Sequence, residues 1–427
     1  MTNSEETIKN VNVEENAAVQ TNQEAIVDSS IDFVVDRKVF RGAANRAMKA
    51  VDPKSSINAL TMLKLTVSSD WAMLTGSDAD ITVQALVISN GQNLKVATEG
   101  SVLVPAATLD KAVSAMSGNT IHVSMNGESG ENGILIEDDN SHLVLPIMDA
   151  EMYPKIDKEL KEIGVINATD FGMAIESTAY ASAINSESGV PALQAVRVTF
   201  SGDKATFAAT DSHRLAETSV PFTWTENSSK DEERTILLPA AVLKKAIKMF
   251  NIKSGGEAIT VSMADDGGNK IDLRQGKHIH ISVRALSGNY PEIDHLWEGT
   301  KDPIVSFSVD RNQMRMALNR MFLISDSTRG CAVRATVSPS GFEMRAQSAG
   351  VGKLTEHVDV DGVAGDPFKI AFNPHYLDDA LATMPEKATI HFVGLMRPFT
   401  VDAEGTQTKC LLTPIRVFDD EKQQKNK

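Results

Sequence analysis

Residues 33–46 read FVVDRKVFRGAANR, and residues 307–320 read FSVDRNQMRMALNR. Eight of the fourteen positions are identical across this offset of 274 residues. Half of the offset, 137 residues, separates the two Tyr-Pro pairs at 153–154 and 290–291. The chain therefore reads as three copies of one unit, and repetition on this scale is not expected of a single catalytic cleft.

A second stretch repeats in the same way. LVPAATLDKA at 103–112 matches LLPAAVLKKA at 237–246 and, more faintly, FNPHYLDDA at 372–380. Hydrophobic periodicity predicts an α+β fold in each copy, with helices covering one face of an antiparallel sheet. In the first copy we expect helices at 38–51 and 105–116 and strands at 31–36, 60–67, 71–75, 80–88, 120–125, 133–137 and 142–147.

The length of 427 residues suits three units of about 130 residues each. The first thirty residues carry six acidic side chains against Lys9 alone and are rich in Asn, Thr, Gln and Ser, which predicts a disordered acidic leader. A strand at 408–417 is expected to close the third copy. The predicted organisation is a leader at 1–30, domains at 31–154, 166–295 and 303–417, and a polar tail at 418–427.

The composition disfavours several classes of protein. No stretch approaches the ~18 apolar residues of a membrane span, and the N-terminus lacks a secretory pattern. The only cysteines, Cys331 and Cys410, cannot build a disulfide framework and lack metal-ligand spacing. His278 and His280 share one side of a strand without a third ligand nearby, and no phosphate-binding GxxxxGK[S/T] loop occurs. We therefore expect a cytoplasmic chain with no cofactor, no metal and no membrane contact.

The net charge of −15 argues against nucleic acid as a partner, yet basic residues gather on the expected helices. The helix at 38–51 has one apolar face and one basic face, and basic faces recur in the other copies. An exception is the first helix of the second copy, at about 169–184, which has Glu176 and no basic residue. The side chains that could follow duplex phosphates are Lys38, Arg41, Lys49, Lys244, Lys245, Lys248, Arg311 and Arg315. The simpler alternative is that they only solvate exposed helices.

Three segments carry a resemblance to a known family: ATDSHRLA at 209–216, FNPHYL at 372–377 and LLTPIRV at 411–417. Through them, and across 31–417, the sequence resembles the bacterial sliding clamp, the beta subunit of DNA polymerase III. The resemblance implies three domains per chain and a head-to-tail homodimer that closes into a ring, with helices lining the hole and sheets outside. It also implies a non-enzymatic processivity factor that encircles double-stranded DNA without reading its sequence.

The same resemblance implies a peptide pocket between the second and third domains. Its partners would be the DNA polymerase III catalytic subunit, the clamp loader and other proteins with a clamp-binding motif. Matched position by position, the pocket residues are Leu193, Thr210, His213, Arg214, Leu215, Pro291, Leu296, Asn373, Tyr376, Leu411, Thr413, Pro414, Ile415 and Arg416. Lys54 matches a loop position that touches DNA, and the dimer interface would contain Leu143, Leu145, Leu323 and Ile324.

The chain also departs from the family pattern. The leader and the tail beyond Val417 have no usual counterpart, and Thr413 stands where a larger apolar residue is common. The consecutive Asp211, Ser212 and His213 cannot easily form a nucleophile-base relay, so we expect Asp211 to satisfy backbone groups at a turn. The rival to a clamp is an unlinked multidomain scaffold or a ligand-handling enzyme built on a repeated fold.

Overall fold

The computed structural model describes residues 30–126, 133–155, 160–184, 189–226, 228, 233–253, 255–264, 269–326 and 331–416. Three units of similar architecture occupy these ranges. In each unit, two helices pack on antiparallel sheets. Within the described ranges, none of the helices has both the length and the apolar character needed to span a bilayer.

The first unit contains helices α1 (Arg37–Met48) and α2 (Ala106–Ala115). One of its sheets has the order β5-β1-β7-β8-β9, with β1 (Asp32–Asp36), β5 (Leu94–Thr98), β7 (Thr120–Asn126), β8 (Gly133–Glu137) and β9 (His142–Pro146). The other contains β10-β6-β2-β3-β4, with β2 (Met62–Ser68), β3 (Trp71–Ser77), β4 (Ile81–Ile88), β6 (Gly100–Pro105) and β10 (Met148–Asp149). Helix α1 buries Phe40, Ala43, Ala44 and Ala47, which form the apolar stripe that its sequence predicts.

The second unit contains α3 (Ala168–Thr178) and α4 (Ala240–Ala246). Its strands are β11 (Lys161–Ile166), β12 (Ala195–Ser201), β13 (Lys204–Thr210), β14 (Arg214–Trp224), β15 (Arg234–Pro239), β16 (Ile259–Met263), β17 (Lys270–Gln275) and β18 (Ile279–Arg284). The eleven-residue strand β14 belongs to both sheets, because it pairs with β13 along most of its length and with β11 at its end. Helix α5 (Asp294–Glu298) lies in the connection to the third unit.

The third unit contains α6 (Arg311–Ser325) and α7 (Pro374–Ala382). One sheet has the order β22-β21-β20-β24, with β20 (Val333–Ser338), β21 (Gly341–Ser348), β22 (Gly352–Val358) and β24 (Phe368–Phe372). The other contains β23-β19-β25-β26-β27, with β19 (Val305–Asp310), β23 (Asp361–Ala364), β25 (Lys387–Phe392), β26 (Phe399–Asp402) and β27 (Lys409–Leu412).

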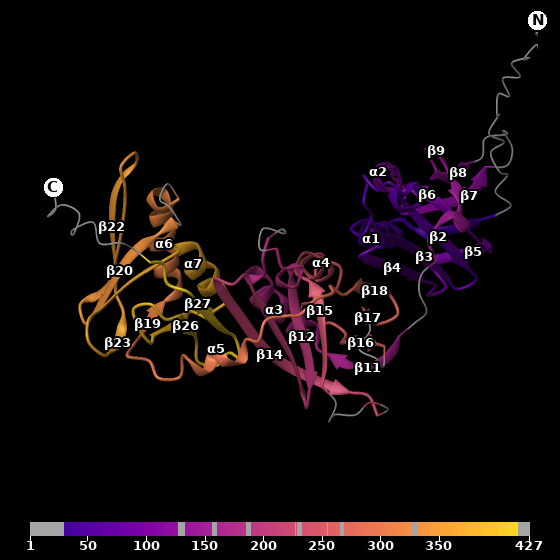
Figure 1. The fold of residues 1–427 in the computed structure, drawn as a ribbon. Coiled ribbons are helices and arrows are strands. Elements are labelled where there is room, and N and C mark those ends of the chain that lie inside the picture. Colours follow the sequence, from indigo (N-terminus) through magenta and orange to yellow (C-terminus); the bar gives the residue numbers. More distant parts are fainter. Residues whose placement is uncertain are drawn as a thin grey trace, which may run out of the picture.

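Two sheets continue from one unit into the next. At the first junction, Ile81–Ala85 of β4 pairs antiparallel with Ile279–Val283 of β18. At the second junction, Arg214–Glu217 of β14 pairs antiparallel with Lys409–Leu412 of β27. The units therefore form a bent row, with α1, α4 and α6 toward its concave side and β11, β14 and β23 toward its convex side (Figure 1).

The repeated VDR sequence fixes the helix pairs of the first and third units. Asp36 and Asp310 are the N-cap residues of α1 and α6, and each carboxylate accepts a hydrogen bond from a backbone N–H in the first turn. Arg37 then donates to the Gly118 carbonyl at 2.6 Å, and Arg311 donates to the Met384 carbonyl at 2.8 Å. Each arginine thus binds the chain just beyond the second helix of its unit.

The second repeated arginine also connects the two helices. Arg41 of α1 lies 3.4 Å from Asp110 of α2, and Arg315 of α6 donates to both oxygens of Asp378 of α7 at 2.8 and 3.2 Å. The bidentate contact raises the pKa of Arg315, chiefly through the hydrogen bonds that it donates to Asp378. In the second unit Asn167, not Asp, caps α3, and it does so through its side-chain oxygen. The repeated sequence that predicted the units therefore also supplies the residues that hold the two helices together in the first and third units.

The sequence-based fold is confirmed as α+β with antiparallel sheets, and four of its details differ. The strands β5 and β6, which lie in different sheets, and the short helix α5 were not predicted. The helix expected at 169–184 ends at Thr178 because the chain tightens into a 3₁₀ turn at Ala179–Ala181. The closing strand ends at Leu412, not at residue 417, since Pro414 has no backbone N–H to extend the ladder.

Candidate functional site

The TDSHR sequence forms the tight turn that joins β13 to β14. The Asp211 carboxylate accepts hydrogen bonds from the backbone N–H groups of His213 and Arg214 at 2.9 and 3.0 Å. Ser212 adopts a left-handed backbone conformation with φ of 75°, which explains why a small residue suits this position. The expected turn role of Asp211 is confirmed, and its carboxylate points to the backbone and to Arg214.

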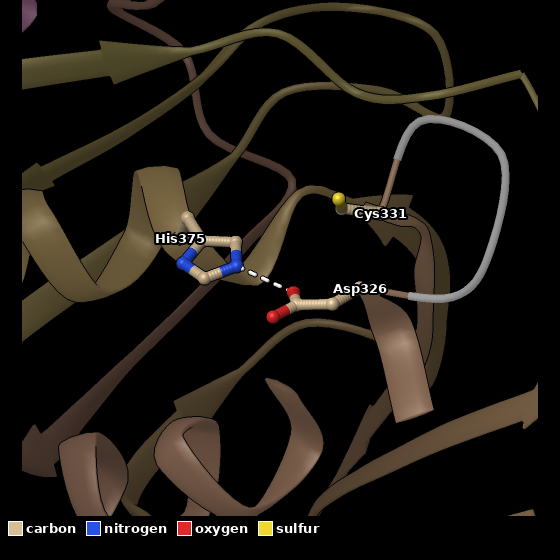
Figure 2. Close-up of side chains that lie close together, drawn as sticks. All are labelled: Asp326, Cys331 and His375. Atoms are coloured by element: carbon tan, nitrogen blue, oxygen red, sulfur yellow. Dashed lines mark hydrogen bonds and ion pairs between the residues drawn. The ribbon is translucent and has the colours of Figure 1, made fainter. Parts of the chain in front are cut away.

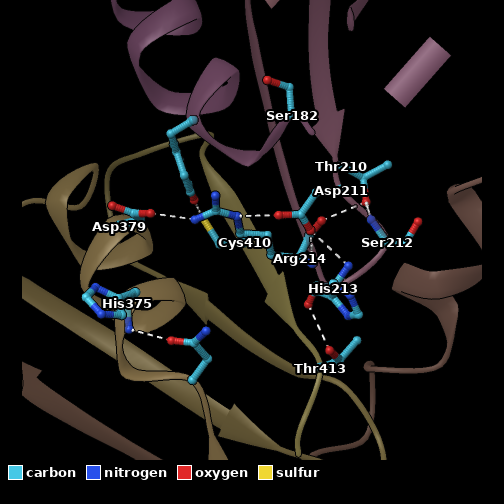
Figure 3. Close-up of polar contacts among 12 residues, drawn as sticks. Ser182, Thr210, Asp211, Ser212, His213, Arg214, His375, Asp379, Cys410 and Thr413 are labelled. Atoms are coloured by element: carbon cyan, nitrogen blue, oxygen red, sulfur yellow. Dashed lines mark hydrogen bonds and ion pairs between the residues drawn. The ribbon is translucent and has the colours of Figure 1, made fainter. Parts of the chain in front are cut away.

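The turn places Arg214 at the centre of the second junction (Figure 3). Its Nε donates to Asp211 at 2.9 Å, and its Nη1 donates to Asp379 of α7. The guanidinium lies 4.6 Å from the ring centre of Tyr376 and 5.4 Å from that of Tyr180. The Arg214 side chain is only 10 % exposed, so a buried cation connects the second unit to the third.

The surroundings of Arg214 shift the acidity of several groups. Burial opposes its charge, but Asp211 and Asp379 outweigh burial and raise its pKa. Burial also raises the pKa of Tyr180 well above its usual value and that of Cys410 to about 11. The Tyr180 hydroxyl lies 3.1 Å from the Cys410 sulfur. At neutral pH Arg214 is therefore positively charged, and Tyr180 and Cys410 keep their protons.

Apolar residues cover the outer side of the same junction. Leu215 of β14 and Leu411 of β27 face each other in register and belong to one buried cluster with Ile293. Leu296 and Trp297 of α5 pack against that cluster. The connection between the second and third units thus folds over the strands that join them, and the Trp297 indole donates to Glu217 at 3.3 Å.

The segment after β27 is held by both units. The Thr413 backbone N–H and its hydroxyl each donate to the His213 carbonyl at 2.9 Å. The Ile415 N–H donates to the Ala371 carbonyl at 2.7 Å. The segment 413–416 therefore lies beside the TDSHR turn, although it is not part of a strand.

The remaining residues of the predicted pocket differ in their exposure. The His213 ring is exposed and stacks on Tyr376, with 6.4 Å between ring centres. Asn373 caps α7 by accepting the His375 N–H, so its side-chain oxygen is already engaged. Leu193 and Thr210 are buried, Leu296, Pro414 and Ile415 are half-buried, and Pro291 and Arg416 are exposed. The Thr210 hydroxyl donates to the Arg214 carbonyl at 2.7 Å.

The predicted DNA-facing residues fall into two groups. Arg41, Arg311 and Arg315 make the contacts between paired helices described above. The lysines are exposed, and they are Lys38, Lys49, Lys54, Lys244, Lys245 and Lys248. Two of these connect the first and second units, because Lys49 donates to the Lys248 carbonyl at 3.0 Å and Lys245 lies 3.5 Å from Asp78.

The four predicted interface residues also fall into two groups, one buried and one exposed. Leu145 and Ile324 are buried within the chain, at 2 % and 8 % exposure. Leu143 on β9 is 38 % exposed and Leu323 on α6 is 73 % exposed. Among the described strands, β9 and β22 are edge strands of the two sheets at opposite ends of the row (Figure 1).

Sequence reasoning missed three residues around Arg214. Tyr180 follows the first helix of the second unit, Asp379 lies on α7, and Cys410 lies on β27. Asp379 directly follows Asp378 in the repeated LDDA segment, which was a signal that this helix carries more acid than its counterparts. Tyr180 and Cys410 gave no such signal, since burial alone explains each residue type.

Comparison with known proteins gives one consistent result. Family models described as the N-terminal, central and C-terminal domains of the DNA polymerase III beta subunit match residues 31–157, 165–292 and 301–416. The "Beta sliding clamp" of Streptococcus pneumoniae serotype 4 is 28% identical over 393 residues, which cover 90% of this chain and 99% of that protein. The corresponding Staphylococcus aureus protein is 23% identical over 394 residues, covering 91% of this chain and 100% of its own.

Solved structures agree with this result. The beta subunit of Streptococcus pyogenes DNA polymerase superposes with a TM-score of 0.82 at 26% identity, covering 91% of this chain and 100% of that chain. The Bacillus subtilis sliding clamp also gives a TM-score of 0.82, at 22% identity and with the same coverage, and supports the fold.

Proposed function

The chain belongs to the beta subunit family of DNA polymerase III, and from that premise we propose how its three units work together. It is a DNA sliding clamp, the processivity factor of a replicative polymerase. The observation that carries the proposal is the pair of continuous sheets, β4 with β18 and β14 with β27, which join three like units into one curved body. We propose domain boundaries at 31–154, 166–295 and 303–417, with the leader and the polar tail outside the described residues.

Two such chains would close a ring. The exposed edge strand β9 at one end and the edge strand β22 at the other can pair head to tail, so that each chain contributes three of six units. Leu143 and Leu323 supply exposed apolar surface near these ends, whereas Leu145 and Ile324 support them from within. Hydrogen bonds between strand edges would be reinforced by this apolar contact.

Duplex DNA would pass through the concave side of the ring. The exposed lysines of α1, α4 and the loop after α1 supply positive charge there, as the family resemblance implies for Lys54. The arginines Arg41, Arg311 and Arg315 contribute to the field of this surface while holding the helix pairs. Contacts of this kind do not depend on base sequence, so the ring can slide.

The second junction would bind the short peptide motifs of partner proteins. Its polar groups, which include the exposed His213 and the half-buried Tyr376, lie near the apolar Leu296, Pro414 and Ile415. Such a combination suits a short peptide with a glutamine and aliphatic side chains. We propose as partners the DNA polymerase III catalytic subunit, the clamp loader and other proteins with a clamp-binding motif. The protein would act by tethering them in the cytoplasm, without catalysis of its own.

Sedimentation equilibrium tests the ring. We expect twice the mass of one chain for the wild type, and a shift toward one chain for Leu323→Asp, which places a charge in the proposed contact. Leu395→Asp is the matched control, because Leu395 is 62 % exposed on the β25–β26 turn, in the sheet that does not contain β22. A single-chain mass for the wild type at micromolar concentration would instead support an unlinked scaffold.

A further inference from the structure

Three side chains with metal-binding atoms meet in the third unit, where α6 ends and α7 begins. They are Asp326 at the C-cap of α6, Cys331 just before β20 and His375 in the first turn of α7 (Figure 2). Their ligand atoms all lie within 4.8 Å of one another, and the His375 Nε2 is 2.7 Å from an Asp326 oxygen. Asp326 and Cys331 are five residues apart, but His375 follows 44 residues after Cys331, so the spacing along the chain did not reveal the cluster.

We propose that Asp326, Cys331 and His375 form a binding site for a zinc-like transition metal ion. A thiolate, an imidazole and a carboxylate are the three ligand types that Zn²⁺ takes in proteins, whereas Mg²⁺ and Ca²⁺ prefer oxygen alone. Three protein ligands leave a fourth tetrahedral position for water. The sulfur ligand also distinguishes this cluster from ordinary surface groups of acidic residues.

The size of the cluster matches tetrahedral coordination after small side-chain movements. Metal–ligand distances of about 2.0–2.3 Å place neighbouring ligand atoms of a tetrahedron roughly 3.3–3.8 Å apart. The hydrogen-bonded Asp326–His375 pair, at 2.7 Å, would open slightly and the separations of up to 4.8 Å would contract. The side chains of Asp326 and His375 are 56 % and 41 % exposed, which gives them room to adjust and lets an ion enter.

Neighbouring groups hold the imidazole in place. The ring of Phe322, one turn before Asp326 on α6, stacks on His375 with 3.9 Å between ring centres and 11° between planes. The His375 backbone N–H is fixed by the Asn373 cap. This support restricts the ring without occupying the nitrogen that faces Asp326 and orients the ligand before a metal arrives.

Metal binding at this site requires that the Cys331 thiol lose its proton. Burial raises the pKa of the Cys331 thiol, and the nearby Asp326 charge adds to this effect. The metal ion would replace the thiol proton, with one Zn²⁺ bound and one H⁺ released, and it would also take the place of the hydrogen bond between Asp326 and His375. Affinity should therefore rise with pH, and the negative charge of Asp326 favours the cation once the thiol is deprotonated.

Cobalt titration of the full chain tests the site, with Co²⁺ as a coloured substitute for Zn²⁺. We expect one equivalent of Co²⁺ per chain, a thiolate-to-cobalt charge-transfer band, tetrahedral d–d bands and loss of both signals on adding Zn²⁺. Cys331→Ser should remove the charge-transfer band, and His375→Gln and Asp326→Asn should each weaken binding by about 10- to 100-fold. His278→Gln is the matched control, since His278 is an exposed histidine outside the cluster.

Two results would overturn the proposal. One is a wild-type spectrum with only weak octahedral bands, which would indicate cation binding to surface oxygens. The other is a charge-transfer band that survives in Cys331→Ser, which would assign the thiolate to Cys410. Circular dichroism of each variant identifies a variant that fails to fold, and in that case Cys331→Ala replaces Cys331→Ser.

Discussion

The two junctions between units use the same backbone device and differ in their side chains. Both continue an antiparallel sheet from one unit to the next. At the first junction Ile81, Val83, Ile281 and Val283 are completely buried, so one face of the shared sheet is closed by apolar packing, while polar and charged residues, among them Asp80 and Lys270, line a hollow at the same junction. At the second, Arg214 and its partners lie beside exposed His213 and half-exposed Tyr376.

The difference indicates a division of work along the chain. The first junction is structural, and the lysines around it, Lys49, Lys245 and Lys248, lie on the side where helices α1 and α4 meet. The second junction is held by a buried cation and by the folded connection around α5, which leaves polar and apolar groups accessible together. The buried apolar face of the first junction suits a rigid frame, whereas the exposed polar and apolar groups of the second suit a peptide-binding site.

Replacement of Arg214 should have the largest effect, because it should weaken both the stability of the second junction and its peptide binding. Arg214→Ala leaves Asp211 and Asp379 without their cation, and we expect a loss of about 2–4 kcal/mol in unfolding free energy, reduced by the partial exposure of Asp379. Binding of a short glutamine-plus-aliphatic peptide, measured by calorimetry, should be abolished. Arg284→Ala at the first junction is the control and should bind normally. Equal peptide affinity in both variants would contradict the assignment of the peptide-binding site to the second junction.

A buried acid should make the first junction sensitive to pH. Asp272 is 1 % exposed, accepts a hydrogen bond from Ser282 at 2.6 Å and lies 3.2 Å from His280, which bonds Gln84 across the junction. Burial opposes its ionisation, but His280, Ser282 and Lys270 outweigh burial and lower the pKa of Asp272. Its contribution to stability is therefore present above the unfolded pKa of about 3.9 and is lost as the pH falls through the folded value.

We therefore expect Asp272→Asn to destabilise the protein by about 1–2 kcal/mol at neutral pH. The gap in unfolding free energy between wild type and variant should begin to narrow below about pH 4, where the unfolded carboxyl takes up a proton, and should narrow further as the pH falls through the lowered folded pKa of Asp272. Urea unfolding at a series of pH values measures this gap. A gap that stays constant down to the acid transition would show that the carboxylate charge does not stabilise the junction.

Single lysine changes should have the smallest effect. Lys248→Ala should lower the affinity for duplex DNA only a few-fold and reduce the slope of log K against log salt by about 0.9. Lys369→Ala is the matched control, because Lys369 is exposed on β24 between the buried Phe368 and Ile370. Identical salt slopes for both variants would argue against the helix side as the DNA surface.

The sequence predicted much of the fold because the repeat and the hydrophobic periodicity act locally. The apolar face of α1 follows directly from residue spacing, whereas the N-caps Asp36 and Asp310 were not predicted, although their residue type favours this position. The arginines of the repeat were interpreted only as charges, since contacts from Arg41 to Asp110 and from Arg315 to Asp378 join segments more than sixty residues apart.

The candidate site could be predicted from the sequence only in part. The family resemblance pointed to Arg214 and Tyr376, whereas Tyr180 and Cys410 are brought there by the folding of three separate segments. The cluster of Asp326, Cys331 and His375 was missed for the same reason, because its ligands are spaced unlike any local metal motif. Long-range contacts of this kind depend on tertiary packing and leave no periodic trace in a single sequence.

Retention on DNA tests the clamp account most directly. Protein loaded by a clamp loader onto a closed circular duplex should remain bound through gel filtration at high salt, because release requires opening of the ring. Linearisation of the same DNA should release the protein within the time of the run, since a ring slides off free ends. Equal retention on circular and linear molecules would contradict encirclement and, with it, the proposed ring.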